Sequence, residues 1–399
     1  MESVTIVGAS LAGLRAAETL RRDGFDGTVT IIGDEPHEPY DRPPLSKQIL
    51  AGTWDPDRAP LADRESLDAL DADWRLGVRA TGLDMAAREV ALSDAEVVHH
   101  DGLVITTGAR CITLPGTEDL EGVYTLRSLD DCLAIRADLL ASPQRVVVVG
   151  AGFIGAEVAA TAKEMGLDVT MVEMADVPFE PILGREMGQV CAAVQHDHGV
   201  DLRTGVGVEA IEGGSRVERV KLGDGTVIEA DVVVVGVGVR PNTEWLEGSG
   251  LTLDNGVVCD ESCLAAPGVV AAGDVARWPN LMFGETMRVE HWDNAVEQGV
   301  HAARRLLSGN AEPYAPVPWF WSDQFDRKIQ LAGRTRPDDQ TEIVTGSLDE
   351  RRFATAYGRD GKLVGILGFN RPRHVMQYRQ LITDGASWDD AMAFARESS

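Results

Sequence analysis

The sequence predicts an α/β protein of more than one domain, because one local pattern occurs twice along the chain. In each copy a short strand rich in β-branched residues leads into a glycine-rich turn, a helix follows, and a second strand closes the unit. The chain has 399 residues, 44% hydrophobic and 25% charged, which is a globular composition with room for two or three domains. No run approaches ~20 apolar residues, so no transmembrane helix is expected.

The first copy lies in the N-terminal segment. Its elements are a strand over residues 4–7, the turn GASLAG over 8–13, a helix over 14–22 and a strand over 28–32. Gly8 permits the sharp turn, Gly13 lets the helix approach the strand, and the helix N-terminus presents N–H groups to a pyrophosphate. Asp34 or Glu35 can bind the ribose hydroxyls. Ser10 replaces the middle glycine of this dinucleotide fingerprint.

The second copy is a complete fingerprint. Its elements are a strand over 146–149, the turn GAGFIG over 150–155, a helix through Ala156 and Ala162, and a strand over 168–173. Glu173 follows Gly150 by 23 residues, close to the spacing expected of the ribose-binding acid. Its carboxylate would repel a 2′-phosphate, and Met174 adds no positive charge, so NADH is preferred over NADPH. A structural turn without a ligand is the alternative.

Three more strands run into turns rich in small residues, over 101–108, 231–242 and 268–274. Two fingerprints indicate two dinucleotides, or one dinucleotide and a vestigial second copy. The additional glycine turns favour FAD together with NAD.

Two longer motifs, PYDRPPLSK over 39–47 and PWFWSDQ over 318–324, resemble the FAD-dependent ferredoxin reductases of bacterial oxygenase systems. The resemblance covers nearly the whole chain. It implies a glutathione-reductase-like α/β fold with two Rossmann-like three-layer nucleotide-binding domains and a C-terminal α/β domain. The implied division is an FAD-binding domain of residues 1–110 and 238–311, an NAD-binding domain of 111–237, and a C-terminal domain of 312–399 that covers the flavin and contributes to the ferredoxin-docking face.

The same resemblance implies which residues bind the cofactors. The FAD set is Gly8, Ser10, Ala12, Gly13, Asp34, Glu35, Arg42, Pro43, Lys47, Ala80, Thr107, Gly108, Arg127, Gly273, Asp274, Glu290, His291, Trp292 and Trp321. The NADH set is Gly150, Gly152, Phe153, Ile154, Gly155, Glu157, Glu173 and Gly238. Ser10 and Thr106 depart from the glycine and alanine that are commoner in the family.

Lys47 and Glu157 are the catalytic candidates, tuning the locale where nicotinamide C4 meets flavin N5. Lys47 has apolar neighbours in sequence, and a buried lysine needs a carboxylate partner, for which Glu157 is the candidate. A solvated surface lysine is the alternative. Asp293 reads as the N-cap of the following helix. Trp319 and Trp321 alternate, which indicates packing or stacking.

The five cysteines form no C-x-x-C pair, so neither a disulfide framework nor a zinc site is expected, and no metal site is predicted. Relatives that work through a redox thiol place it near Ser46, where this chain has none. A thiol relay is therefore not expected, and the cysteines read as buried core residues.

The net charge of −27 disfavours nucleic acid and membrane surfaces as partners. Residues 351–379 nevertheless hold seven basic residues and one acidic residue, a candidate docking face for an acidic [2Fe-2S] ferredoxin, with Arg304 and Arg305 adding to it if they lie nearby. Ordinary solvated arginines are the alternative. The N-terminus lacks a signal-peptide pattern, which predicts a cytoplasmic protein. We expect a monomer or weak homodimer.

These observations and the resemblance together predict an NADH-dependent ferredoxin reductase, an enzyme of the ferredoxin–NAD(+) reductase type. It would pass a hydride from NADH to FAD and then single electrons to a ferredoxin that serves a P450 monooxygenase or a ring-hydroxylating dioxygenase. The alternatives are an NADH oxidase or quinone reductase of the same fold, and a redox-sensing flavoprotein.

Overall fold

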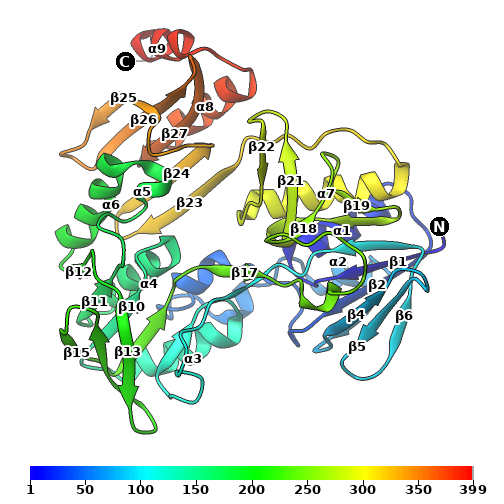
Figure 1. Cartoon of the computed structure of the whole chain (residues 1–399), viewed down its shortest axis with the longest axis horizontal. Coiled ribbons are helices and arrows are strands. Elements are labelled where there is room, and N and C mark those ends of the chain that lie inside the picture. The colour runs from blue at the N-terminus through cyan, green and yellow to red at the C-terminus, as the bar shows by residue number, and fades with distance from the viewer. Residues whose placement is uncertain (398–399) are drawn as a thin grey trace. The chain divides into compact units, whose positions relative to one another are not determined.

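The computed structural model describes residues 1–397 and confirms the α/β fold (Figure 1). The contacts between residues divide the chain into two compact units, each assembled from separate segments. Unit 1 holds residues 1–41, 59–110 and 240–318, and unit 2 holds 42–58, 111–239 and the chain from 319 onward. The last two residues of the predicted C-terminal domain, 398–399, lie outside the described residues.

Unit 1 is built on a six-stranded sheet. Its strands lie in the order β19 (Leu264–Ala266), β20 (Val269–Ala271), β7 (Gly102–Ile105), β1 (Ser3–Val7), β2 (Thr28–Gly33) and β3 (Ala72–Leu76). Strands β20 to β3 run parallel, and β19 is antiparallel to β20. Helices α1 (Leu11–Arg22) and α7 (Trp292–Ser308) pack against each other and against the sheet.

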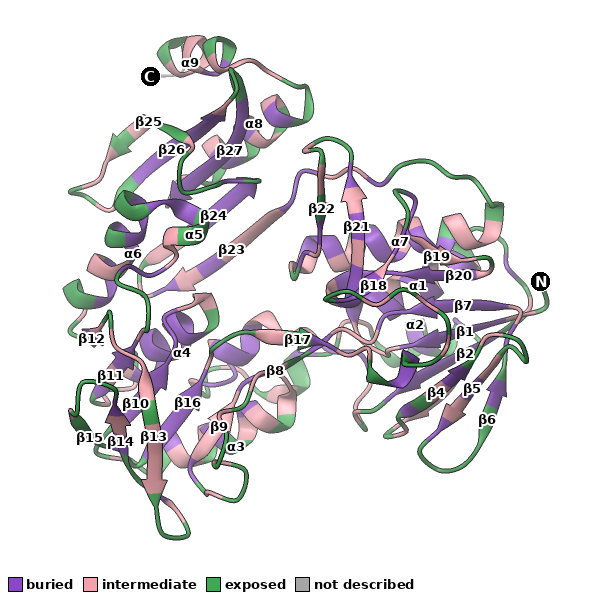
Figure 2. Cartoon of the chain, in the orientation of Figure 1, coloured by how far each residue is buried: buried purple, intermediate pink, exposed green. Residues whose placement is uncertain are grey.

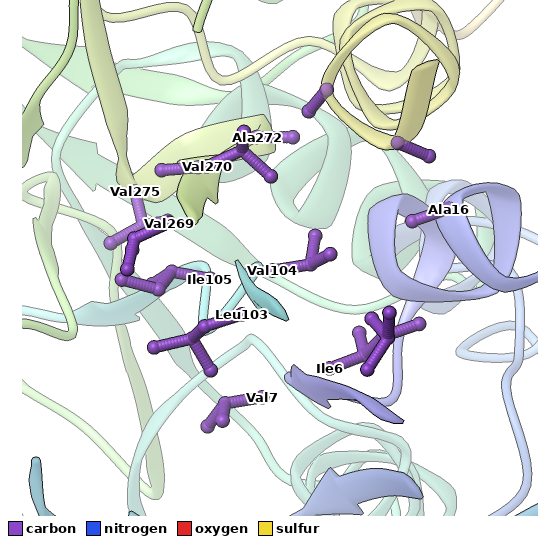
Figure 3. Packing of buried hydrophobic residues seen from close by; sticks show 14 of the residues in the cluster. Ile6, Val7, Ala16, Leu103, Val104, Ile105, Val269, Val270, Ala272 and Val275 are labelled. Carbon is purple, nitrogen blue, oxygen red and sulfur yellow. The ribbon is translucent and has the colours of Figure 1, made fainter. Parts of the chain in front are cut away.

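The central strands of unit 1 are apolar along their whole length because both faces of a parallel sheet are covered. Ile6 of β1, Val104 of β7 and Val270 of β20 are fully buried, and they lie near one another in the core (Figure 3). Ala16 of α1 is also fully buried, and its small side chain lets the helix approach this layer.

Smaller elements complete unit 1. They are the antiparallel sheet of β4 (Ala80–Asp84), β5 (Glu89–Leu92) and β6 (Val97–His99), the sheet of β18 (Val257–Val258), β21 (Ala276–Asn280) and β22 (Glu285–Met287), and the short helices α2 (Arg64–Asp68), η3 (Glu244–Leu246) and η4 (Gly273–Val275). Strands β8 (Ala109–Cys111) and β17 (Val239–Pro241) pair where the chain passes between the units.

Unit 2 begins with a second parallel sheet. Its strands lie in the order β12 (Asp201–Arg203), β11 (Val169–Val172), β10 (Val146–Val149), β16 (Val232–Val235) and β9 (Val123–Thr125). Around it are α3 (Leu129–Leu140), α4 (Phe153–Glu164), the antiparallel strands β13 (Val208–Gly213), β14 (Val217–Leu222) and β15 (Val227–Glu229), and the turns η1 (Pro43–Ser46) and η2 (Pro56–Arg58).

The C-terminal part of unit 2 is an antiparallel sheet. Its strands lie in the order β23 (Trp319–Gln324), β24 (Arg327–Gly333), β27 (Lys362–Phe369), β26 (Arg352–Arg359) and β25 (Gln340–Ser347). The helices that contact it are α5 (Glu180–Leu183), α6 (Arg185–Asp197), α8 (Pro372–Thr383) and α9 (Trp388–Glu397). Strands β24, β26 and β27 are mostly buried (Figure 2), because helices cover the sheet.

Two predicted boundaries need correction. Helix α1 begins at Leu11 rather than at residue 14, because the second half of the glycine turn is already helical. Helix α7 begins at Trp292 with His291 at the N-cap, so Asp293 is not the cap. Asp293 instead lies in the first turn, where its carboxylate still faces the positive end of the helix dipole. No helix among residues 1–397 is both long and apolar enough to cross a bilayer.

Candidate functional site

The turn between β1 and α1 is so tightly packed that it requires glycine at two positions. Gly8 has a φ of +121°, and a Cβ added there would lie 2.1 Å from the carbonyl oxygen of Thr106. A Cβ added at Gly13 would lie 2.0 Å from the carbonyl oxygen of Gly8. The Thr106 hydroxyl donates to that same oxygen at 2.9 Å. The threonine that departs from the family pattern therefore holds the turn in place.

Helix η4 approaches this turn from a distant part of the chain. A Cβ added at Gly273 would lie 3.2 Å from the Cβ of Ala12, so these two predicted residues are neighbours. The amide of Gly273 donates to Oε1 of the fully buried Gln298 at 2.9 Å. Arg288 donates to the carbonyl oxygen of Asp274 at 2.9 Å. The N-terminus of α1, with first-turn amides that lack helical acceptors, thus meets a fixed acidic turn, an arrangement that fits a dinucleotide.

The other predicted residues of unit 1 lie at the ends of its strands and helices. Thr107 and Asn242 exchange hydrogen bonds at 2.8 and 2.9 Å, which fixes the turn through Gly108. Trp292 donates from Nε1 to Asp41 at 2.7 Å, with Glu290 and His291 directly before it. Ala80 is buried at the start of β4.

The two candidate ribose acids of unit 1 have different surroundings. Glu35 accepts a hydrogen bond from the Tyr40 hydroxyl. The Asp34 side chain is 56% exposed and lies 3.9 Å from Arg79. Both carboxylates follow β2, so the choice between them stays open.

The turn between β10 and α4 requires glycine for packing at two positions but not at a third. Gly150 has a φ of +99°, and a Cβ there would lie 2.4 Å from the carbonyl oxygen of Gly236; at Gly155 it would lie 2.2 Å from that of Gly150. At Gly152 the nearest atom is 4.0 Å away. The packing of the chain therefore leaves room for a side chain at Gly152. A pyrophosphate that approached this turn closely would take up that room. This cradle fits a dinucleotide.

Glu173 lies over this second turn. Its Oε2 accepts from the amide of Ala151 and its Oε1 from that of Ala175, both at 2.8 Å. Met174 beside it is 78% exposed, and Ile154 is 50% exposed. The carboxylate is thus held at the turn by backbone amides, where a ribose would meet it.

Phe153 and Gly238 complete the predicted NADH set. Phe153 stacks on Phe179 with ring centroids 4.2 Å apart and meets the edge of Phe320 at 4.6 Å. Gly238 has a φ of +108° just before β17, a conformation that favours glycine.

The predicted partnership of Lys47 and Glu157 is confirmed. Lys47 Nζ lies 2.7 Å from Glu157 Oε2, and the two side chains are 13% and 3% exposed. Lys47 directly follows η1, and Glu157 lies one turn into α4, behind the second glycine turn. The pair therefore links the predicted flavin-facing turn to the predicted coenzyme-binding helix.

The remaining predicted FAD residues of unit 2 lie in three segments. Arg42, followed by Pro43, donates to the carbonyl oxygen of Arg127. Trp321 stacks on Trp319 with centroids 5.3 Å apart, as the alternation predicts. The implied FAD residues are thus divided between the two units.

Several polar residues that fix the site residues within each unit were not predicted from the sequence. Ser46 and Ser322 both donate to Glu157, and Gln298 fixes the amide of Gly273. A signal was present for Ser322, because alternation along β23 places it on the opposite face from the two tryptophans. For Ser46 and Gln298 the local sequence carries no such signal.

Four of the five cysteines are buried as predicted, whereas Cys111 is only half-buried. Burial raises the pKa of Cys132, Cys191 and Cys259 to about 12, and it also raises the pKa of Cys111 and Cys263. Thiolates are therefore disfavoured at all five positions. Among residues 1–397 no group of three or more His, Cys, Asp or Glu side chains is placed to hold a metal ion.

Comparison with known proteins identifies the family. Residues 2–299 match the pyridine nucleotide-disulphide oxidoreductase family, and residues 319–398 match the reductase C-terminal family. The chain is 40% identical to rhodocoxin reductase of Rhodococcus erythropolis, over 95% of this chain and 89% of that protein. It is 36% identical to the ferredoxin–NAD(+) reductase component of the anthranilate 1,2-dioxygenase system of Burkholderia cepacia, over 96% and 95%.

The fold agrees with these sequence matches. The crystal structure of the covalent putidaredoxin reductase–putidaredoxin complex superposes with a TM-score of 0.92 at 33% identity, covering 96% of this chain and 93% of that one. Family and fold imply FAD and NAD(H) as cofactors, in agreement with the two cradles. The chain therefore belongs to the pyridine nucleotide-disulphide oxidoreductase family, among the ferredoxin reductases of oxygenase systems.

Proposed function

We propose that this protein is an NADH-dependent ferredoxin reductase that passes electrons to a [2Fe-2S] ferredoxin serving a P450 monooxygenase or a ring-hydroxylating dioxygenase. Bound FAD would supply the conversion chemistry, since a flavin accepts two electrons as a hydride and releases them singly. The relatives named above support the proposal, because they carry rhodocoxin and ferredoxin reductase in their names.

The observation that carries the proposal is the environment of Ser46. Relatives that work through a thiol place it near this position, whereas here a serine hydroxyl donates to Glu157 beside Lys47. Burial, nearly complete at four of the five cysteines and partial at Cys111, raises the pKa values of their thiols. A bound flavin would therefore pass its electrons to an outside acceptor without a protein thiol.

The chain's own residues bind and orient the two dinucleotides. Gly8, Gly13, Gly150 and Gly155 shape the turns, and the helix N-termini behind them receive the pyrophosphates. Glu173 would accept hydrogen bonds from the ribose hydroxyls of NADH and would repel the 2′-phosphate of NADPH. Glu157 lies in α4, the helix proposed to bind the coenzyme, and holds the ammonium group of Lys47. This positive charge would stabilise the negative charge that develops on a bound flavin when it is reduced.

The ferredoxin would dock transiently and through charge, on fewer basic residues than the sequence indicated. Arg351 pairs with Asp197 at 3.2 Å and Arg359 with Asp339 at 2.7 Å, so acids from outside the segment neutralise part of it. Arg304 and Arg305 bond to Asp23 and Ser262 within unit 1. Arg352 and Arg373 stay exposed near the end of the sheet where Arg371 contacts the Arg352 carbonyl oxygen, and they are the charges on which an acidic ferredoxin would dock. Lys362 is also exposed, but it lies at the opposite end of the β26–β27 pair.

The setting of the enzyme is proposed on general grounds. A net charge of −27 disfavours nucleic acids and anionic membranes as partners. We place the enzyme in the cytoplasm, where NADH is available, as a monomer or weak homodimer. We also keep the division into an FAD-binding domain, an NAD-binding domain and a C-terminal domain, the last covering the flavin and contributing to docking.

The test is a reconstitution with purified components. The yellow holoenzyme is titrated with NADH, and cytochrome c reduction is then measured with and without a [2Fe-2S] ferredoxin, using NADPH as the control donor. We expect bleaching of the flavin by NADH and cytochrome c reduction that depends on the ferredoxin. Reoxidation by oxygen or a quinone that is faster than by the ferredoxin would support an NADH oxidase or quinone reductase and overturn the proposal.

A further inference from the structure

Glu157 is a buried carboxylate on which three separate segments of unit 2 meet. Its Oε2 accepts from Lys47 Nζ at 2.7 Å and from the Ser46 hydroxyl, both at the end of η1. Its Oε1 accepts from the Ser322 hydroxyl at 2.8 Å and from the amide of Asp323 at 3.1 Å, both in β23. Each oxygen thus receives two hydrogen bonds, which offsets the cost of burying the charge.

A chain of hydrogen bonds fixes the direction in which the Ser322 hydroxyl points. Gln195 donates from Nε2 to Oε1 of Gln324 at 2.9 Å, and Gln324 donates from Nε2 to the Ser322 oxygen at 3.2 Å. All three side chains are at least 98% buried, so water does not compete for these groups. Because the Ser322 oxygen already accepts a hydrogen bond from Gln324, its own hydroxyl hydrogen is directed to Glu157.

The turn that carries Ser46 is fastened to the helices of unit 2. Thr161 of α4 donates from its hydroxyl to the carbonyl oxygen of Ser46 at 2.7 Å. Cys132 of α3 donates from its thiol to the carbonyl oxygen of Leu45 at 3.1 Å. The backbone on which Lys47 sits is therefore held independently of the ion pair. Both serine hydroxyls make their short bonds to the Glu157 side chain, and Ser46 approaches the backbone oxygen of Pro43 only at 3.5 Å.

We propose that Ser46 and Ser322 are positioning residues that clamp the Glu157 carboxylate from both sides and thereby fix the ammonium group of Lys47. This inference rests on the proposed function, in which Lys47 faces the flavin. One carboxylate then ties Lys47 to β23, where Trp321 directly precedes Ser322. If either hydroxyl is removed, the ion pair remains, but the carboxylate can rotate and Lys47 follows it.

The first test compares hydride transfer in matched variants of the holoenzyme. Ser322→Ala and Ser46→Ala should lower the rate constant of flavin reduction at saturating NADH about tenfold, the scale of one hydrogen bond to a charged group. The dissociation constant for NADH should stay within about twofold, because neither serine lies at the glycine turn. Ser322→Thr keeps the hydroxyl and should restore most of the rate.

Thr355→Val is the matched control. Thr355 is 1% exposed in β26 of the same sheet, and its hydroxyl contacts the Met187 sulfur rather than Glu157. This variant removes a buried hydroxyl without touching the clamp, so flavin reduction should be unchanged. An equal loss of rate in the control and in Ser322→Ala would show a general packing effect and overturn the positioning role.

A second measurement does not depend on turnover. Equilibration of each variant with a reference dye reports the ratio of reduced to oxidised flavin at a fixed potential. A displaced Lys47 stabilises reduced flavin less, so Ser322→Ala should lower this ratio at least about threefold, with no change in Thr355→Val. An unchanged ratio and rate in both serine variants overturns the clamp and leaves the proposed function standing. Failure of the wild-type protein to reduce a ferredoxin overturns the function instead.

Discussion

The two glycine-rich turns have similar backbone geometry, yet different groups secure them. In unit 1 the Thr106 hydroxyl donates to the carbonyl oxygen of Gly8, so the chain holds its own turn. In unit 2 the amide of Ala151 donates to the Glu173 carboxylate, and this carboxylate is the group predicted to bind ribose. The middle position is Ser10 in the first turn and Gly152 in the second.

This difference fits the roles of the two dinucleotides. A turn that is held by a side chain with no part in binding suits a cofactor that stays in place through many turnovers. A turn whose amide donates to the carboxylate predicted to bind ribose suits a coenzyme that arrives and leaves. The carboxylate could then exchange the backbone amide for a ribose hydroxyl as its partner. The comparison predicts that substitutions in the first turn act on folding and flavin retention, whereas those in the second act on coenzyme use.

The largest effect is expected from Gly8→Ala. Its Cβ would lie 2.1 Å from a backbone oxygen, and the φ of +121° is strained for alanine. Overpacking and backbone strain together should lower the free energy of unfolding by roughly 3–5 kcal/mol. Denaturant unfolding and the flavin content of the purified protein measure this effect.

Gly82→Ala is the control in the same unit, because its Cβ would meet nothing nearer than 3.8 Å. This variant should retain its flavin and unfold almost as the wild type does. If Gly8→Ala behaved like Gly82→Ala, the first turn would not be held as tightly as its contacts indicate.

Unit 1 should also lose stability in mild acid, through His100. This side chain is 3% exposed and neither ring nitrogen has a hydrogen-bond partner among the described residues. Burial, with smaller contributions from His99 and Arg88 and an opposing one from Asp101, lowers its pKa from 6.5 to about 4. The unfolded state therefore binds the proton more tightly, and stability is lost as the pH falls from 6.5 toward 4.

The size of this acid effect follows from the pKa difference. The loss should approach about 3 kcal/mol, at 1.36 kcal/mol for each pH unit between the two pKa values. Unfolding curves of the wild type and of His100→Leu, measured between pH 7 and 4, isolate the contribution of this residue. Parallel curves for the two proteins would show that His100 is not the acid-sensitive group.

Coenzyme preference tests the second turn directly. Glu173→Ala combined with Met174→Arg removes the negative charge that would repel a 2′-phosphate and supplies a positive charge that would bind it. Because Met174 is exposed, the arginine does not disturb the core. The ratio of kcat/KM for NADPH to that for NADH should rise about 10- to 100-fold. Met174→Arg alone, which retains the carboxylate, should change it less. An unchanged ratio in the double variant would contradict the assignment of this turn to the coenzyme.

The sequence predicted elements with a strong local pattern and one distant ion pair, but it did not predict every helix boundary. Strand β10 has the predicted bounds, 146–149, because a run of four valines between a polar segment and a glycine turn has few other structures available. The Lys47–Glu157 pair, 110 residues apart, was predictable because a buried lysine demands a carboxylate. The N-cap of helix α7 was predicted two residues too late, since nothing local shows that Trp292 enters the helix before Asp293.

Contacts made by small polar groups over long separations were beyond the sequence. Ser46 and Ser322 reach Glu157 across 111 and 165 residues. A serine hydroxyl can bind to water or to a buried carboxylate, so the presence of a serine in the sequence does not indicate its partner. The grouping of residues 42–58 with unit 2 likewise depends on tertiary contacts, such as that of Thr161 with Ser46.

The smallest effects are expected when the two turns exchange their middle residues. In Gly152→Ser the new side chain meets no atom of the chain nearer than 4.0 Å from its Cβ, and serine is a favoured N-cap for α4, so the melting temperature should hold or rise slightly. The new serine side chain would enter the space predicted for the pyrophosphate, so KM for NADH should rise about 3- to 10-fold.

Ser10→Gly is the counterpart in the first turn. Ser10 makes no side-chain capping bond to α1, so the free energy of unfolding should change by less than about 0.5 kcal/mol, with flavin content unchanged. Steady-state kinetics and thermal unfolding of both variants complete the comparison. If Gly152→Ser left KM for NADH unchanged, the open space above Gly152 would not be the coenzyme's path, and the two turns would differ in sequence without differing in use.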